Sequence, residues 1–430
     1  MTGRPPETAR VTEARRGHAR WSQPFRPFFP SAALVGALLV APWLLAFLGD
    51  WSVPIPGGAL VWHIHEMVFG LGLGAAGGFL LTALPAWSGT PMLRGRGLAV
   101  LWGTWVAARG VVLLAGTLPG PLVALILLLP TLGMGSLIAA AIMRGGAIRH
   151  AVFAVTALSL VAVHALFLAV WLDLPMPGFL VSWIDARGLD PLRWLGDLGV
   201  LLLAMTHACV ISRVAPVLGP EALRLSGRHP EVRADPARAR LIALTLGATV
   251  AACAVAPLSP VTGWLAWAAA AAQMDRLGGI WIGRAARHSF FHGFVLATLF
   301  LVVALVLLGA SRLLPVAGLD AAWHAAGAGT LGVGCLTVFG VASRRHMGGA
   351  LPLSRPATAA IWLAATGAAL RVAAPFTWTV PWGADALAPL LLWASTVLWS
   401  GGFLVFLIGH ARPLFGRAPS RAPQPKGASA

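Results

Sequence analysis

The amino-acid sequence predicts an all-α membrane protein that crosses the bilayer about twelve times. Of its 430 residues, 58% are hydrophobic and only 10% are charged, whereas about 25% of residues are charged in a typical soluble domain. Apolar runs of roughly 20 residues, the length that crosses a hydrocarbon core, fill nearly the whole chain. The Lys and Arg residues are concentrated in the short segments between these runs, which is the pattern of a multi-pass membrane protein.

The expected spans follow one another with short loops between them. In order, they cover residues 29–48, 62–84, 98–115, 121–142, 150–172, 194–217, 241–257, 260–283, 290–311, 322–343, 356–374 and 386–409. The eighth is the weakest, because Gln273, Asp275 and Arg276 interrupt it. We therefore expect a polar cytoplasmic arm at 1–28, one membrane domain at 29–410, and a tail at 411–430 whose composition is typical of disorder.

The distribution of positive charge predicts the orientation of the spans. If the N-terminus is cytoplasmic, the cytoplasmic segments hold most of the 31 Lys and Arg residues, for example Arg94, Arg96 and Arg344. The opposite loops hold few, such as Arg187 and Arg312. Loops rich in Lys and Arg stay in the cytoplasm, so both termini should lie there, in a bacterial inner membrane. The net charge of +17 is then explained by membrane topology and lipid contact, and we expect no nucleic-acid partner.

Three histidines open spans at the predicted periplasmic face and are the first metal candidates. His63 and His65 begin the second span, and His324 begins the tenth. Imidazole is a good ligand for iron, copper and zinc. Residues i and i+2 of a helix point about 200° apart, so His63 and His65 cannot share one ion if both are helical. Glu66 could orient a ligand imidazole; the plainer interpretation is a His-rich helix end at the membrane interface.

Two further histidine positions are weaker candidates. His288 and His292 have the i, i+4 spacing that places both on one helix face, so a metal or haem role is open for His292. His207 lies at mid-membrane between Met205 and Cys209. Soft ligands favour copper(I), so we include His207 among the metal candidates, although core packing is the simpler explanation for it.

Arginines within the spans need a negative partner. Arg109 and Arg213 both lie inside predicted spans, where an unpaired charge is costly. Haem propionates would satisfy them, as would Glu66, Asp197 or the carbonyl groups at helix C-termini. The chain has no Tyr and no adjacent His-His pair in any span, which disfavours a respiratory oxidase of the haem-copper type.

Several motifs resemble the NnrS family. They are Pro24-Phe25-Arg26-Pro27-Phe28-Phe29, Trp62-His63-Ile64-His65-Glu66-Met67-Val68-Phe69-Gly70, Gly78-Phe79-Leu80-Leu81-Thr82-Ala83-Leu84-Pro85-Ala86-Trp87-Ser88-Gly89 and Leu93-Arg94-Gly95-Arg96. The resemblance implies a twelve-helix inner-membrane protein that carries haem and copper and is linked to nitric oxide metabolism and nitrosative-stress resistance in denitrifying and related bacteria. Matching motifs make His63, His65, Glu66, His292, His324 and Arg213 candidate site residues. One departure is His164, where family members usually have Asn.

The hypothesis from the sequence is therefore a haem- and copper-binding membrane protein that handles nitric oxide or its iron-nitrosyl adducts. Two other classes stay open. A secondary transporter would have broken helices near the midplane, for which the eighth span, with Gly278 and Gly279, is the clear candidate. A factor that inserts metal or haem into another membrane complex is the third hypothesis. The sequence does not indicate whether the protein is an enzyme.

Overall fold

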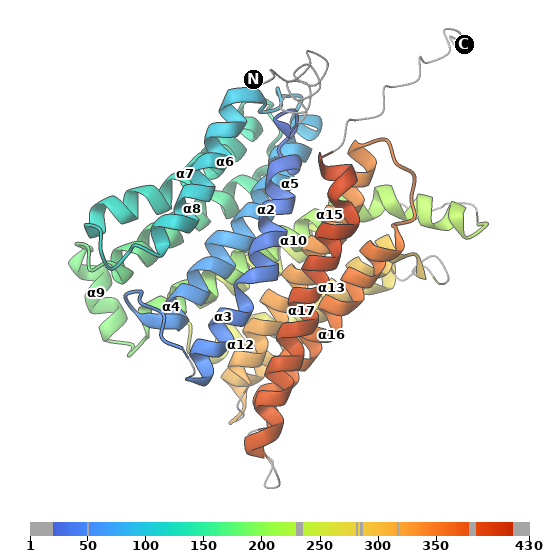
Figure 1. The fold of residues 1–430 in the computed structure, drawn as a ribbon. Coiled ribbons are helices and arrows are strands. Elements are labelled where there is room, and N and C mark those ends of the chain that lie inside the picture. The colour runs from blue at the N-terminus through green and yellow to red at the C-terminus, as the bar shows by residue number, and fades with distance from the viewer. Residues whose placement is uncertain are drawn as a thin grey trace, which may run out of the picture.

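A computed structural model describes residues 20–49, 51–228, 235–280, 283, 287–315, 318–377 and 384–415. The described residues form helices and loops without a β-strand, which confirms the all-α class (Figure 1). Among them, ten helical segments are long and apolar enough to cross a membrane. Each of the twelve predicted spans overlaps a helix, but α6, with 18 residues, and α12, with 21, are not among these ten. The count of twelve crossings stays a prediction.

The helices follow the predicted spans closely. Their bounds are α2 Phe25–Leu38, α3 Val40–Leu48, α4 Gly58–His65, η1 Glu66–Gly72, α5 Leu73–Ser88, α6 Gly95–Val112, α7 Gly120–Arg144, η2 Ile148–His150, α8 Ala151–Trp171, α9 Gly178–Asp185, α10 Pro191–Leu225, α11 Pro236–Val255, α12 Pro260–Ile280, α13 Ser289–Leu313, α14 Leu319–His324, η4 Ala325–Val333, α15 Gly334–His346, α16 Arg355–Thr377 and α17 Ala384–Phe415. The first span is thus two helices, α2 and α3, and the short helix α9 lies outside the predicted set.

Small residues let the first and last helices pack closely. A Cβ added to Gly36 of α2 would lie 3.0 Å from the ring of Phe403 in α17. Close contacts at a small residue are typical of membrane helices, where van der Waals packing drives association. The start of α2 and the end of α17 lie at the same end of the bundle (Figure 1). This arrangement agrees with an even number of crossings.

Two boundaries differ from the sequence prediction. Helix α2 begins at Phe25, and Phe25 and Phe28 are completely buried. Residues 25–28 therefore belong to the helical bundle, although we assigned them to the cytoplasmic arm, because their aromatic rings gain more from packing than from solvent. At the other end, α17 continues to Phe415, and residues 416–430 of the predicted tail lie outside the described residues.

The eighth span is not broken. Helix α12 runs without interruption through Gln273, Asp275 and Gly278. Its polar residues have protein partners: the Arg276 guanidinium donates to the Gln273 side-chain oxygen and to the Ala208 carbonyl, the latter at 2.6 Å. Asp275 accepts from Arg238 Nε at 2.6 Å. The break expected for a transporter at this position is therefore absent.

The irregular backbone lies in two other spans. Residues Glu66–Gly72 (η1) and Ala325–Val333 (η4) are π-helical, and each is continued by an α-helix. A His lies just before or near the start of each segment, His65 before η1 and His324 before η4. Short π-helical segments inside α-helices occur frequently at functional sites. The two segments therefore direct attention to the second and tenth spans.

Candidate functional site

A cavity of about 650 Å³ lies between the spans that contain η1 and η4. Its wall is mostly apolar and comes from α3, α4, α10, α14, α15, α16 and α17 together with the two π-helical segments. Its charged and histidine lining residues are His63, Arg193, Asp197, Asp320, His324 and Arg371. Sites for small molecules and cofactors commonly have this size and this mixture of an apolar wall with a few polar groups.

His63 and His324 reach this cavity from helices that are distant in sequence. Their ring centroids are 6.3 Å apart and their planes differ by only 16°. A zinc–imidazole bond is about 2.0–2.1 Å, and the ring centre lies about 1 Å behind the bonded nitrogen. Two imidazoles on opposite sides of one metal ion therefore have centroids about 6 Å apart. The observed centroid separation of the His63 and His324 rings matches that distance.

The contacts of His324 leave one of its ring nitrogens free for a ligand. His324 Nδ1 is 2.8 Å from the Asp320 carbonyl oxygen and 3.3 Å from its carboxylate. Both of these oxygens are hydrogen-bond acceptors, so Nδ1 of His324 carries the proton. Nε2 is then the nitrogen with a free lone pair. The Asp320 carboxylate is also 3.0 Å from the Arg371 guanidinium. The His63 ring stacks on Trp43 with centroids 4.4 Å apart.

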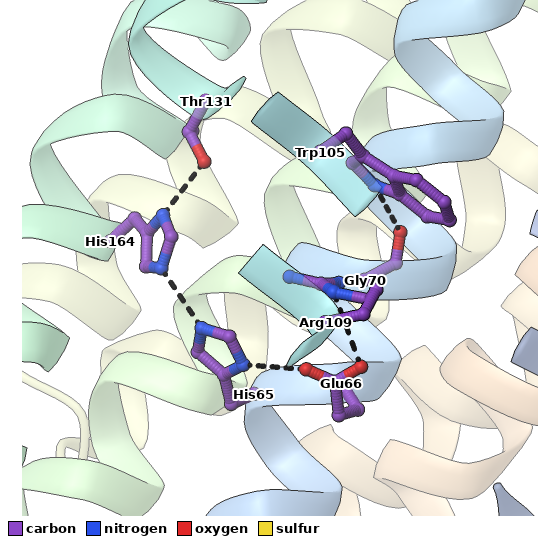
Figure 2. A network of polar contacts seen from close by, with 7 residues as sticks. All are labelled: His65, Glu66, Gly70, Trp105, Arg109, Thr131 and His164. Atoms are coloured by element: carbon purple, nitrogen blue, oxygen red, sulfur yellow. Dashed lines mark hydrogen bonds and ion pairs between the residues drawn. The ribbon is translucent and has the colours of Figure 1, made fainter. Parts of the chain in front are cut away.

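His65 points to a different cluster, which is buried among α4, η1, α6, α7 and α8 (Figure 2). His65 and His164 are completely buried, and their Nε2 atoms are 3.2 Å apart. Their Nδ1 atoms face outward: that of His65 is 3.0 Å from Glu66 Oε1, and that of His164 is 2.7 Å from Thr131 Oγ1. The Phe69 ring covers His164, with a centroid separation of 3.8 Å.

Glu66 joins this cluster to a buried cation. Its second carboxylate oxygen is 3.4 Å from Arg109 Nε, and the Glu66 side chain is only 2% exposed. The Arg109 guanidinium also lies 5.3 Å from the centre of the Trp105 ring. Trp105 Nε1 donates to the Gly70 carbonyl at 3.1 Å, and a Cβ at Gly70 would lie 2.3 Å from Arg109. The negative partner of Arg109 is thus Glu66, one of the alternatives that the sequence left open.

Removing the charge of Glu66 should destabilise the protein strongly. In Glu66→Gln the buried Arg109 cation loses its anion, and breaking a buried ion pair from one side costs about 3–5 kcal/mol. The measurement is the free energy of unfolding in detergent, followed by helical circular dichroism during denaturant titration. Glu221→Gln is the matched control, because its pair with Arg224 is largely exposed and is worth at most about 1 kcal/mol. Equal losses in both variants would contradict the assignment.

Other predicted residues lie apart from both clusters. The His292 ring lies against Trp362, with centroids 5.1 Å apart and planes inclined by 48°, and it does not line the large cavity. His288 precedes α13 and contacts Ser226 at 3.1 Å. The pair therefore does not share a helix face as the spacing suggested, because the helix starts only at Ser289. Arg213 is exposed and donates to the Arg149 carbonyl at 2.6 Å.

His207 lies in α10 beside a separate small cavity of about 40 Å³. Among the described residues, no cluster of three or more His, Cys, Asp or Glu side chains is arranged as a metal site. The predicted ligands therefore fall into two pairs: His63 with His324, and His65 with a residue that the sequence analysis left outside its candidate set, His164.

Three residues of these clusters escaped the sequence analysis. Asp320 is four residues before His324, the spacing at which helical side chains meet, so this pair carried a detectable signal. His164 was visible as a histidine of the fifth span and as a departure from the family pattern, but neither feature indicated that it meets His65. Thr131 had no signal at all, because a lone Thr in an apolar span is ordinary.

The comparisons with known proteins point to one family. A family described as "NnrS protein" matches residues 19–417. The match covers both histidine clusters and every described helix from α2 onward. No curated protein matches the chain.

Proposed function

Because the chain belongs to the NnrS family, we propose that it is a haem- and copper-binding protein of the bacterial inner membrane that takes part in nitric oxide metabolism or nitrosative-stress resistance. The observation that carries the proposal is the pair of near-parallel imidazoles, His63 and His324, across a cavity of about 650 Å³. Nitric oxide or an iron-nitrosyl species would be the ligand that the protein handles.

The residues around the large cavity fit a haem. His63 and His324 would hold the haem iron, and Asp320 would orient His324 through its Nδ1 proton. Arg193 and Arg371 line the same cavity and could pair with propionates. Apolar residues such as Trp323, Leu331 and Leu392 would cover the macrocycle. When bound, haem supplies an iron that can bind a diatomic ligand or exchange an electron. The ligands of the iron and the polarity of the surrounding pocket decide which of the two it does.

The buried pair His65 and His164 fits two ligands of a copper ion. Two nitrogens bound to a tetrahedral ion at about 2.0–2.1 Å lie roughly 3.3 Å apart, and the two Nε2 atoms are 3.2 Å apart. Glu66 and Thr131 hold the opposite nitrogens, as outer partners of ligand histidines usually do. The same distance also suits one N–H···N hydrogen bond from His164 to His65, so metal content must decide between the two.

We further propose that α6 and α12 cross the membrane, which gives twelve spans with both termini in the cytoplasm. Both helices contain an arginine that has a partner inside the bundle. Arg109 of α6 pairs with Glu66, and Arg276 of α12 donates to Gln273 and to a backbone carbonyl. Buried charges that are paired in this way occur in membrane helices. The continuous α12 removes the main argument for a transporter, and no observation favours an assembly factor over the proposal.

The direct test is the optical spectrum of the purified protein together with its iron and copper content. We expect a Soret band typical of six-coordinate haem, about one haem per chain, and bound copper. We also expect a deletion strain to grow more slowly than its parent under nitric oxide. A colourless, metal-free protein from haem-replete cells would refute the cofactor assignment, and an unaffected deletion strain would refute the nitric oxide role.

Replacing Asp320 with Asn should weaken haem binding without removing a ligand. The variant removes the negative charge beside His324, which makes its imidazole a weaker electron donor. It also removes the ion pair between Asp320 and Arg371. Loss of such an outer partner typically lowers metal affinity about 10–100-fold, and the midpoint potential should rise. Haem titration and spectroelectrochemistry measure the two effects. Asp185→Asn, an exposed change in α9, is the control, and an unchanged potential in Asp320→Asn would contradict the proposed role.

A further inference from the structure

Arg213 of α10 meets the loop that joins α7 to α8, and the two cations found there have no anion. The Arg213 guanidinium donates to the Arg149 carbonyl at 2.6 Å, and Arg149 Nε donates to His150 Nε2 at 3.2 Å. The other guanidinium nitrogens of both arginines have no partner among the described residues. Neither arginine belongs to an ion pair of the described part of the chain. The described residues therefore do not supply the negative partner that the sequence analysis expected for Arg213.

The loop that carries Arg149 is held against α5. Gly145 packs so closely on the Ser88 carbonyl that a Cβ at this position would collide with it. The His150 ring stacks on Trp87, with centroids 5.4 Å apart and planes inclined by 21°. Together with the hydrogen bond to the Arg149 carbonyl, these contacts fix the two cations side by side. A site that is already ordered loses less conformational entropy when it binds a ligand.

The two cations lie at the depth of lipid head groups. Arg193 and Arg213 are 20 residues apart in the continuous helix α10, which corresponds to a rise of about 30 Å. The hydrocarbon core of a bilayer is also about 30 Å thick, so one arginine lies at each boundary of the core when α10 stands across the membrane. The half-buried Trp87, which contacts His150, fits this depth, because Trp is enriched at membrane interfaces. In the proposed topology, Arg213 is at the cytoplasmic boundary.

Exposed apolar side chains flank the two cations. Ile148 directly precedes Arg149 and is 84% exposed, and Val217 is 61% exposed. Val217 follows Arg213 by four residues, so the two side chains share one face of α10. A soluble phosphate ion gains nothing from apolar neighbours, whereas the acyl chains of a phospholipid bury apolar surface against them. The combination of two free cations and exposed apolar groups therefore favours a lipid over a free anion.

We propose that Arg149 and Arg213 bind the phosphate group of an anionic phospholipid of the surrounding bilayer. Guanidinium groups donate paired hydrogen bonds to phosphate oxygens, and basic sites between membrane helices on the cytoplasmic side bind lipid head groups. The lipid phosphate supplies the negative charge that the described residues do not provide, and Ile148 and Val217 contact the apolar part of the lipid. The site involves neither histidine pair, so it does not rest on the proposed cofactors; the proposed topology decides only which leaflet supplies the lipid.

Native mass spectrometry of the full chain tests the proposal. The protein is released from micelles that contain equal amounts of phosphatidylglycerol and phosphatidylcholine, which both carry a phosphate although only the first has a net negative charge. We expect the chain to retain phosphatidylglycerol about fivefold over phosphatidylcholine. Equal retention of the two lipids would overturn the proposal. Displacement of the bound lipid by inorganic phosphate would overturn it as well, because the site would then belong to a soluble anion.

Variants identify the groups that hold the lipid. Arg213→Gln should lower the retention of phosphatidylglycerol about fivefold. Arg224→Gln is the matched control, because this arginine of the same helix already pairs with Glu221 at 2.9 Å, and it should leave the retention unchanged. Ile148→Glu keeps both arginines and their contacts but adds a carboxylate beside them, so it should lower the retention even if Arg213→Gln folds poorly. Unchanged retention in Ile148→Glu, or an equal loss in Arg224→Gln, would overturn the proposal.

Discussion

Replacement of His324 or His63 by Ala is expected to abolish the six-coordinate haem spectrum. Each variant removes one of the two imidazoles whose ring centroids are 6.3 Å apart, and no other described histidine lines the cavity to replace it in holding a haem iron. The remaining ligand should give either a five-coordinate haem or a fall of more than tenfold in haem content. The double variant should be colourless.

His292→Ala is the informative control for this experiment. Family resemblance alone makes His292 as good a candidate as His324, but its ring contacts Trp362 and does not line the cavity. The His292→Ala protein should therefore keep its full haem content and an unchanged Soret band. If it loses haem while His324→Ala keeps it, the placement of the haem in the large cavity is wrong. Haem is quantified per chain by the pyridine haemochrome method.

Replacement of His164 by Asn should remove copper while leaving haem in place. An Asn side chain can still donate a hydrogen bond to His65, but it is a poor copper ligand compared with imidazole. If the 3.2 Å contact of the two Nε2 atoms is bridged by copper, metal content should fall from about one to near zero per chain. Elemental analysis and the copper electron paramagnetic resonance signal of the oxidised protein measure the change.

The contrasting result would be just as clear. Should His164→Asn keep its copper and lose no stability, the contact is a hydrogen bond and the copper site lies elsewhere. His150→Ala serves as the control, because His150 is another buried histidine, which packs against Trp87 at the start of α8. Its removal should leave the copper content unchanged. The haem content of both variants should match that of the unmodified protein, which keeps this test independent of the first.

The sequence by itself determined the class of fold and nearly all its elements. A segment must be apolar over its whole length to enter a bilayer, so each of the twelve predicted spans overlaps a helix of the structure. Local helix geometry likewise required His63 and His65 to diverge, and the two residues do meet different partners, His324 and His164. These properties depend only on neighbours in the chain, which is why composition and spacing suffice to predict them.

Only the tertiary structure decided which distant side chains meet. Nothing in the spacing pairs His63 with His324, or His65 with His164, because the rotation and order of helices in the bundle are set by packing against other helices. The same packing removed His292 from the cavity, brought Asp320 and Arg371 into it, and paired Arg109 with Glu66. The histidines at the predicted periplasmic face were visible from the sequence, but their division into two sites required the three-dimensional arrangement of the spans.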